Sequence, residues 1–421
     1  MSSRKRRRLW ASIRAAGAGV LARTREVLTT EPGGEGDAGE RAAAHQQASD
    51  ARAERGGLAK LAQLRAYFLG PGAARDGQAR TELAALWDRA EPAAWADVLA
   101  VLEDQLGDPD EIFEQIDTAP LASASLGQVH AALWKGREVV VKVQYPGVAE
   151  TLAGDLEDDR FVRQLFGVDS GRGMAAGAQA LREVLARELD YREEANAQRR
   201  FIAAFSGDPS LSIPGVIDEC STERVLTTER VRGRSLMEVV RAKDDDERSR
   251  LGRALLHFHF ASILGHGLLN ADPNPGNVLI PEQGPPVFID FGAWLELDPE
   301  LLGHEQQMWR SLLMDDQVRG VVQFRSALVD SGLASAAEMG SANQAEWERL
   351  LALPVLTAGS FRWSPEYAEK LVDSTSRMLR LGGLEVGSQL SVLWRARLGV
   401  ASLLGALRAE VDARAVLEPL L

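Results

Sequence analysis

The feature that most constrains the fold is a pair of nearby segments, each of which combines polar residues with a short apolar run. Residues 270–280 read NADPNPGNVLI, and residues 286–292 read PVFIDFG. Asp272 and Asn277 are five positions apart, and Asp290 follows Asn277 by thirteen positions at the end of an apolar, strand-like stretch. A D-F-G triplet alone is a weak signal, but its distance from the D-x4-N stretch makes the arrangement specific.

This spacing is that of the catalytic and metal-binding loops of protein kinases. Phosphoryl transfer needs a carboxylate near the acceptor hydroxyl, which Asp272 would supply. It needs oxygen ligands on Mg²⁺, which Asn277 and Asp290 would supply. It also needs a cation on the nucleotide phosphates. The pattern therefore predicts a site that binds ATP or ADP together with Mg²⁺.

The candidate for that cation is Lys142, which lies between Val141 and Val143 in a strand-like run. Residues 128–144 read as a hairpin with its turn at 135–137. A lysine buried in a strand is costly unless it is paired. An outward-facing strand lysine is the alternative, and the alternation does not decide between them because valines occupy both faces.

In kinases this lysine pairs with a glutamate on a helix. Residues 178–205 are helical in pattern and rich in acids. Periodicity alone does not choose among these acids, which are Glu183, Glu188, Asp190, Glu193 and Glu194.

The glycine-rich loop that usually covers the nucleotide is absent from the sequence before this hairpin. Its place is taken by Ala122, Ser123, Ala124 and Ser125, followed by Leu126-Gly127. A loop with Cβ atoms approaches the phosphates less closely than glycine does. The chain is therefore predicted to be an atypical member of the kinase-like proteins.

Composition excludes several other classes of protein. The chain has 421 residues, 45% of them hydrophobic, and a net charge of −13, which are globular values and argue against a broad nucleic-acid surface. Cys220 is the only cysteine, so an intrachain disulfide is excluded and a reducing compartment such as the cytoplasm is favoured. No uninterrupted apolar run is long enough to span a bilayer.

The first 30 residues differ from the rest. They hold eight Lys or Arg and one acid, so this basic head carries +7 and the remainder −20. Apolar residues at three- and four-residue steps predict an amphipathic helix that can lie on an anionic membrane surface. A solvated tail is an equally good interpretation, and a nucleic-acid arm ranks third. Residues 31–56 are small, charged and Gly-rich, and are interpreted as a linker.

Several longer stretches extend the pattern over about residues 57–421. They are PLASASLGQVHAAL (120–133), VVVKVQYPGV (139–148), ELDYREEANAQRRF (188–201), RVLTTERVRGRSL (224–236), ADPNPGNVLI with FIDFG, and LWRARLGVASLLGALR (393–408). In this order they resemble the UbiB-like (AarF) family of atypical kinases, which includes the coenzyme Q biosynthesis kinases. The resemblance implies that Lys142 contacts the nucleotide and that Glu194 is its helix partner.

The resemblance also implies roles for residues that the spacing did not reveal. Glu188 and Asp190 match the family's E-x-D motif. Lys60 and Gln63 match a K-x-G-Q motif in an N-terminal extension that folds over the active site, where Lys60 would pair with Glu188. The segment 229–231, with Glu229 and Val231 at its ends, would be the hinge that contacts adenine.

Three positions depart from the family's pattern. Ala62 replaces the glycine of K-x-G-Q, while Asn270 and Asn274 stand where the family usually or often has histidine. The metal-binding pair survives these changes, so the departures bear on the positioning of Asp272 and on turnover. The family's membrane-anchoring C-terminal helices are not expected, because AEVDARAVLEPLL is too charged to span a bilayer.

The fold that these observations predict is α+β and bilobal, protein-kinase-like, with an N-terminal helical extension over the active-site cleft. The expected parts are the head (1–30), the linker (31–56), the extension (57–117), a small lobe with an antiparallel sheet (118–232) and a mainly helical large lobe (233–421). Long helices are expected at 246–266 and 389–409.

Three functions fit the sequence. The first is an atypical ATP-dependent kinase or ATPase that supports quinone or other isoprenoid-lipid metabolism, with a nucleotide, a membrane surface or lipid intermediate, and lipid-biosynthesis proteins as partners. The second is a small-molecule phosphotransferase, since such enzymes also use a D-x4-N loop and a metal aspartate. The third is a nucleotide-sensing scaffold without turnover. We expect a cytoplasmic protein, with peripheral membrane contact through the head as the alternative.

Overall fold

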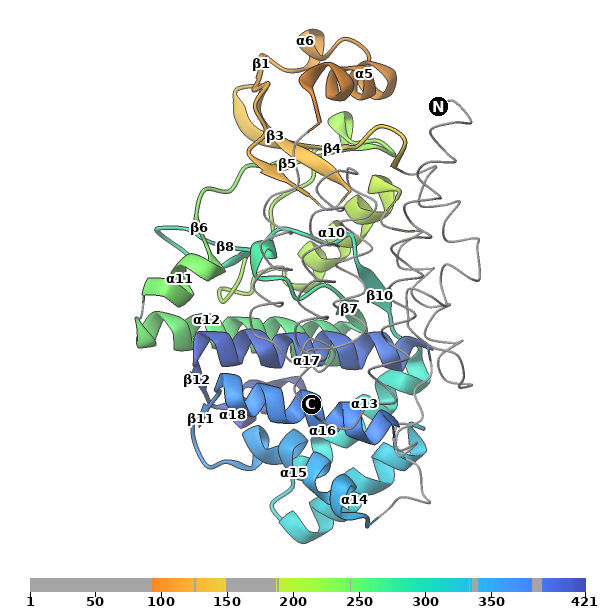
Figure 1. Cartoon of the computed structure of the whole chain (residues 1–421), viewed down its shortest axis with the longest axis vertical. Helices are drawn as coiled ribbons and strands as arrows, with labels where there is room; N and C mark the ends of the chain where they lie inside the picture. The colour runs from red at the N-terminus through yellow and green to blue at the C-terminus, as the bar shows by residue number, and fades with distance from the viewer. Residues whose placement is uncertain are drawn as a thin grey trace, which may run out of the picture. The chain divides into compact units, whose positions relative to one another are not determined.

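Figure 1 shows the protein as a computed structural model, which describes residues 93–124, 126–148, 187, 189–242, 244–332, 334, 340–380 and 388–421. The chain divides into two units. The described part of the smaller unit comprises residues 93–98, 120–124, 126–129 and 144–148, and the larger unit contains the other described residues. Every side chain paired in the candidate site below belongs to the larger unit.

Strands of the N-terminal half form one antiparallel sheet. Its order is β1-β3-β4-β5, with β2 also paired to β3. The strands are β1 (Gln115–Ile116), β2 (Ala122–Ser123), β3 (Gly127–Trp134), β4 (Arg137–Gln144) and β5 (Val225–Glu229). The predicted antiparallel hairpin therefore exists and is extended by β5, whose Leu226 lies opposite Lys142.

The turn between β3 and β4 is tighter than the sequence predicts. Lys135 and Gly136 both have positive φ, at 49° and 71°, and Arg137 already belongs to β4. A two-residue turn with positive φ at both positions matches the twist of the flanking strands. The placement of Arg137 in the turn was therefore wrong.

The face of β4 that carries Lys142 follows from the strand period of two. Val139, Val141 and Val143 are fully buried on one face, whereas Val140 and Lys142 are partly exposed on the other. Because Val140 shares the lysine's face, apolar alternation in the sequence did not identify that face.

Helix α10 (Tyr191–Ala204) packs on β5 and lies within the predicted helical segment. Asp190 precedes the helix and caps it, because its side chain accepts from Arg192 N at 2.9 Å. The buried face of α10 includes Tyr191, Ala195 and Phe201, and it also includes the charged Glu194. A buried glutamate needs a partner.

The C-terminal half is mainly helical. Its helices are α11 (Leu236–Ala242), α12 (Asp245–Phe260) with a π-helical continuation (Ala261–Gly265), α13 (Pro299–Leu312), α14 (Gln317–Asp330), α15 (Ala342–Leu356), α16 (Pro365–Arg380), α17 (Ser388–Leu407) and α18 (Ala413–Leu417). Helix α17 runs alongside α12 and packs against α16 (Figure 1). The predicted helices at 246–266 and 389–409 correspond to α12 with its continuation and to α17.

Short strand pairs interrupt these helices. β7 (Leu268–Asn270) pairs with β10 (Trp294–Glu296), and β6 (Arg234–Ser235), β8 (Val278–Ile280) and β9 (Val287–Phe288) form a three-stranded sheet. β11 (Phe361–Arg362) pairs with β12 (Glu410–Val411). These pairs place both polar segments of the sequence motif at strand ends.

The predicted N-terminal extension falls only partly within the described residues. Residues 93–112 include α5 (Trp95–Leu106) and α6 (Pro109–Ile112), as the helical pattern predicts, whereas residues 57–92 lie outside. Gln115 and Ile116 are not helical, because they pair with Leu133 and Ala132 of β3. Within the described part of the chain, no helix is both long and apolar enough to cross a bilayer.

Candidate active site

The two motif segments meet through a β-hairpin. Asn277 immediately precedes β8 and Asp290 lies just beyond β9, and in this hairpin Val278 is opposite Phe288. The Ile289 N–H donates to the Asn277 carbonyl at 3.0 Å. The twelve residues between Asn277 and Asp290 are thus a hairpin that returns the chain to its starting point.

Lys142 lies between two carboxylates. Its Nζ is 2.8 Å and 2.9 Å from the two Glu194 oxygens and 3.8 Å from Asp290 Oδ2. The Lys142 side chain is 17% exposed and Glu194 2%, whereas Asp290 is 32% exposed. The structure therefore brings together Lys142, Glu194 and Asp290, with the opening toward solvent on the aspartate's side of the group.

Electrostatics keep this lysine charged. Burial by itself lowers the pKa of Lys142, but the carboxylates of Asp290 and Glu194 outweigh burial and hold that pKa well above its ordinary value. The Lys142 Nζ also lies 4.9 Å from the centroid of the Tyr191 ring, a cation–π contact. The Lys142 side chain is therefore protonated at neutral pH and faces two carboxylates.

Asp272 and Asn277 also contact each other. The Asn277 Nδ2 donates to Asp272 Oδ2 at 3.1 Å and to the Asp272 carbonyl at 3.2 Å. With its NH₂ directed at Asp272, Asn277 has its amide oxygen as the atom that can ligate a metal. Asp290 Oδ1 accepts from Gly292 N at 3.1 Å, so this carboxylate is oriented by the backbone.

Asn270 connects the two loops. Its Nδ2 donates to the Asp290 carbonyl at 2.9 Å, and its Oδ1 accepts from the Asp272 N–H at 3.0 Å. The sequence marks this asparagine only as a departure from the family's histidine. In the structure it is a positioning residue that fixes the backbone of both acids, a role that its position two residues before Asp272 could have suggested.

Tyr191 is a second residue that sequence reasoning did not single out. It is fully buried beneath the lysine at the first position of α10. Its place three residues before Glu194, on the same helical face, was the available signal.

Other predicted site residues have local structural partners. Asp190 caps α10 and lies 4.0 Å from Arg192 Nε. The Glu229 carboxylate accepts from Gly215 N at 2.9 Å at the end of β5, and Val231 follows in the segment that leads to β6. Their contacts with a nucleotide stay predictions.

The Ala/Ser loop is described in part. Ala122 and Ser123 form β2, and the Ala124 N–H donates to the Gly127 carbonyl at 2.8 Å. Ser125, Glu188, Lys60 and Gln63 lie outside the described residues, and so does Ala62. The predicted pairing of Lys60 with Glu188 and the placement of the site in a cleft stay predictions.

The donor set suits Mg²⁺. Asp290 and Asn277 offer one carboxylate and one amide oxygen, and Mg²⁺ is commonly held by one or two carboxylates plus substrate phosphates. Among the residues that the structure describes, no group of three or more His, Cys, Asp or Glu side chains could enclose a metal.

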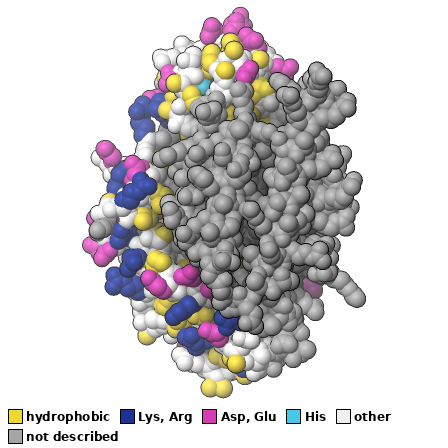
Figure 2. Space-filling view, in the orientation of Figure 1, with side chains coloured by type: hydrophobic (Ala, Val, Ile, Leu, Met, Phe, Trp, Pro, Cys, Tyr) yellow, Lys and Arg dark blue, Asp and Glu magenta, His cyan; other side chains and the backbone are white. Residues whose placement is uncertain are grey.

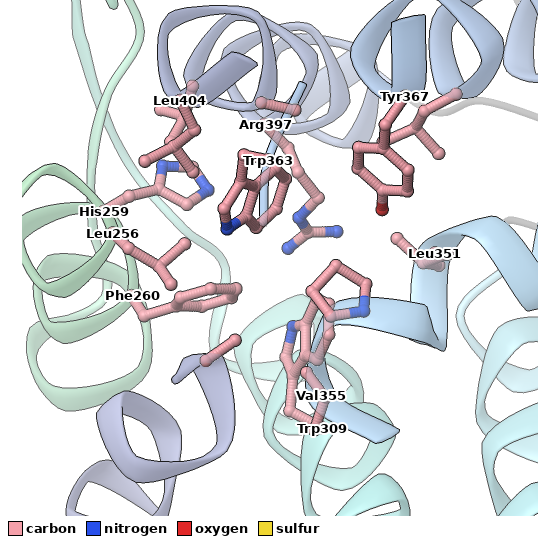
Figure 3. Close-up of a pocket in the computed structure, with 15 residues that line it drawn as sticks. Leu256, His259, Phe260, Trp309, Leu351, Val355, Trp363, Tyr367, Arg397 and Leu404 are labelled. Carbon is pink, nitrogen blue, oxygen red and sulfur yellow. The ribbon is translucent and has the colours of Figure 1, made fainter. Parts of the chain in front are cut away.

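A second ionic group lies elsewhere in the larger unit, beside a small apolar pocket of about 40 Å³. Figure 3 shows Arg397 of α17 among Trp309, Trp363 and His259. The Arg397 Nη2 donates to Glu305 Oε2 at 2.6 Å, and Trp309 Nε1 donates to the same oxygen at 3.1 Å. Arg397 and Glu305 are 6% and 4% exposed, so this pair is closed to solvent.

Several known proteins are similar to this chain. A family model described as the ABC1 atypical kinase-like domain matches residues 85–324. The Arabidopsis thaliana protein "activity of bc1 complex kinase 8, chloroplastic" is 35% identical over 231 residues, which cover 52% of this chain and 30% of that protein. The Caenorhabditis elegans "atypical kinase coq-8, mitochondrial" is 36% identical over 200 residues, covering 46% and 26%. The chain thus spans half or less of the length of these curated relatives.

A solved structure is similar over nearly the whole chain. The complex of Rv3197 with erythromycin from Mycobacterium tuberculosis has a TM-score of 0.64 and 27% identity, covering 91% of this chain and 96% of that one. With the family match, this likeness confirms the predicted α+β, protein-kinase-like fold.

Proposed function

Because the chain belongs to the ABC1 atypical kinase-like family, as its motifs predict, we propose that it is an ATP-dependent kinase or ATPase that uses Mg²⁺. The observation that supports this most is the group formed by Lys142, Glu194 and Asp290, with Nζ 2.8 Å from one acid and 3.8 Å from the other. Protein kinases use a lysine paired with a helix glutamate, together with the DFG aspartate, for phosphoryl transfer.

The residues have separate tasks in this proposal. Glu194, which is buried, fixes Lys142 so that its ammonium group neutralises phosphate oxygens. Asp290 and Asn277 would hold the metal, which would supply positive charge near the phosphates. Asp272 accepts the proton of the attacking hydroxyl or water and is held in place by the Asn277 amide and the Asn270 side chain. Catalysis then rests on positioning and electrostatics.

We further propose a role in quinone or isoprenoid-lipid metabolism, with the basic head on a membrane surface. The likeness to a relative named atypical kinase coq-8 supports the first part. The +7 charge of residues 1–30 supports the second, since basic segments are attracted to anionic lipids. Sedimentation with anionic and neutral vesicles tests it, and equal sedimentation of the full chain and a chain lacking residues 1–30 would remove the membrane proposal.

The test of the enzymatic proposal is a thermal shift with ATP or ADP, with and without Mg²⁺, followed by phosphate release. At one hundred times its Kd, a ligand specific to the folded state adds roughly 2.7 kcal/mol. We expect a Mg²⁺-dependent shift for the wild type that Asp290→Asn abolishes. The matched control is Glu282→Gln, an exposed acid between β8 and β9.

Asp272→Asn separates turnover from binding. We expect it to keep the shift and lose phosphate release, because Asp272 acts on the acceptor rather than on the metal. A wild type that binds nucleotide and never releases or transfers phosphate would favour the scaffold function instead. A wild type that shows no Mg²⁺-dependent shift contradicts the proposal altogether.

A further inference from the structure

Helix α17 lies outside the part of the chain that the kinase-like family model matches, yet it contacts the loop that carries Asp272. The match ends at residue 324, and α17 spans Ser388–Leu407. Two of its residues, Arg395 and Gly399, touch the loop. They are four positions apart and therefore lie on one face of the helix.

Arg395 holds the peptide bond that precedes Asp272. Its Nη2 donates to the Ala271 carbonyl at 2.7 Å. The other side of the same peptide unit is the Asp272 N–H, which donates to Asn270 Oδ1 at 3.0 Å. Because a peptide unit is planar and rigid, contacts at both ends fix its orientation and hence where the backbone enters Asp272.

Gly399 lets the loop approach the helix. A Cβ atom at this position would lie 2.4 Å from Pro273 Cγ, which is far inside van der Waals contact. Pro273 directly follows Asp272 and has a rigid ring, so it does not yield as a flexible side chain would. The loop is therefore held by α17 on both sides of Asp272, at Ala271 and at Pro273.

The opposite face of α17 is anchored in the core. Arg397, two positions after Arg395, points the other way and pairs with Glu305 of α13. The helix thus connects a closed core ion pair to the loop.

We propose that Arg395 and Gly399 of α17 are positioning residues for Asp272, so that the supporting element of the catalytic loop comes from outside the matched kinase-like domain. This inference rests on the proposed function for its activity readout, and on the geometry of the loop for a second readout that needs no turnover.

The chain offers a matched control for Gly399. A Cβ at Gly405, on the same helix, would lie 2.8 Å from the Ser364 carbonyl and 3.1 Å from the Ala368 Cβ, at the start of α16 rather than at the loop. Gly399→Ala and Gly405→Ala therefore both crowd one side of α17 with the same added methyl group. Only Gly399→Ala pushes on the loop.

The experiment compares Gly399→Ala, Gly405→Ala, Arg395→Met and Arg395→Lys as full-length proteins. We expect kcat for phosphate release to fall on the order of tenfold to a hundredfold in Gly399→Ala and Arg395→Met, because displacements of about 1 Å cost this much. The Kd for Mg²⁺-ATP should change less than threefold. Arg395→Lys, which keeps a donor, should recover part of kcat, and Gly405→Ala should keep kcat in its folded fraction.

Hydrogen exchange provides the readout that is independent of turnover. Amides of the loop are bonded in the wild type, with Ala271 N to Ala293 O at 2.8 Å and Asn277 N to Asn274 O at 3.0 Å. We expect peptides covering 268–278 to exchange faster in Gly399→Ala and Arg395→Met than in Gly405→Ala.

If the wild type has no turnover, the proposed function fails, but the hydrogen-exchange comparison still tests whether α17 positions the loop. Equal exchange in Gly399→Ala and Gly405→Ala overturns the positioning role, as do equal losses of kcat in the two variants.

Discussion

Two buried ionic groups in the larger unit use similar side chains for different ends. Lys142 faces two carboxylates, Glu194 and Asp290, and the second of these is 32% exposed. Arg397 faces one carboxylate, Glu305, and both are almost fully buried. In the first group the lysine pairs with two carboxylates, one of them partly exposed, whereas in the second one arginine pairs with one carboxylate and both are closed to solvent.

This difference indicates which kind of buried ion pair is a candidate functional site. Arg397 is covered by the rings of Trp309 and Trp394, at 5.1 Å and 4.8 Å from its guanidinium carbon. Such packing supports a charge and closes it to solvent, beside a small apolar pocket of about 40 Å³. At Lys142 the partly exposed Asp290 reaches solvent, and the proposed binding of a cation and phosphates would take place on this side. A buried ion pair with a further carboxylate that reaches solvent is therefore the better candidate site.

The largest expected effect is at Lys142. Lys142→Met should lower kcat for phosphate release on the order of 10²- to 10³-fold, because it removes the charge that stabilises the transferred phosphoryl group. It should also lower the melting temperature, since Glu194 is left buried without its cation. The double variant Lys142→Met/Glu194→Gln should regain stability without regaining turnover. Recovery of turnover in that double variant would contradict the role given to the lysine.

The matching change in the closed pair should affect stability alone. Glu305→Gln leaves the buried Arg397 without its carboxylate, which should cost about 3–5 kcal/mol of unfolding free energy. Denaturant titration measures this loss. The folded fraction should bind Mg²⁺-ATP as the wild type does, and a weakened Kd would show that the two groups are coupled.

His259 gives the closed group a pH dependence. Burial, and next the Arg397 guanidinium, lower the pKa of His259 from 6.5 to about 3. The unfolded chain therefore binds a proton that the folded chain refuses, so stability is full above pH 6.5 and falls as the pH drops toward 3. The expected slope from this residue is up to about 1.4 kcal/mol per pH unit.

Urea unfolding between pH 6.5 and 5 measures this slope. His259→Gln should flatten it, and the same substitution at His266, whose side chain is exposed, serves as the control. A slope that survives in His259→Gln would place the responsible protonation elsewhere.

The smallest effect is expected for surface ion pairs. Figure 2 shows basic and acidic side chains interspersed over the described part of one face. Arg192 and Glu223, 3.0 Å apart and 60% and 57% exposed, are a typical pair. A double-mutant cycle with Arg192→Gln and Glu223→Gln should give a coupling energy of about 0.2–1 kcal/mol. A larger coupling energy would contradict the expectation that exposed ion pairs contribute less to stability than buried ones.

The sequence predicted those parts of the site that depend on spacing along the chain. D-x4-N and DFG are separated by a hairpin, so their distance in sequence encodes their contact in space. The family prediction and the kinase-like fold are confirmed for the same reason, because several motifs must keep their order to build one fold.

The parts that the sequence did not predict depend on contacts between distant segments. The resemblance, not periodicity, singled out Glu194 among the acids of its segment, since its burial depends on the sheet that α10 covers. Arg395 lies more than one hundred residues from Ala271, and nothing in its own segment indicates which carbonyl it contacts. Asn270 was noted as a replaced histidine, and its contact with the distant Asp290 became visible only once both loops were placed.

That replacement has a consequence for acid–base behaviour. An imidazole connecting the two loops would gain a proton near neutral pH and change from acceptor to donor. The carboxamide of Asn270 does not titrate, and its two ends keep fixed donor and acceptor roles toward Asp290 and Asp272. The hydrogen bonds that connect the two loops through Asn270 therefore do not depend on pH. Any pH optimum of the protein must originate in other groups.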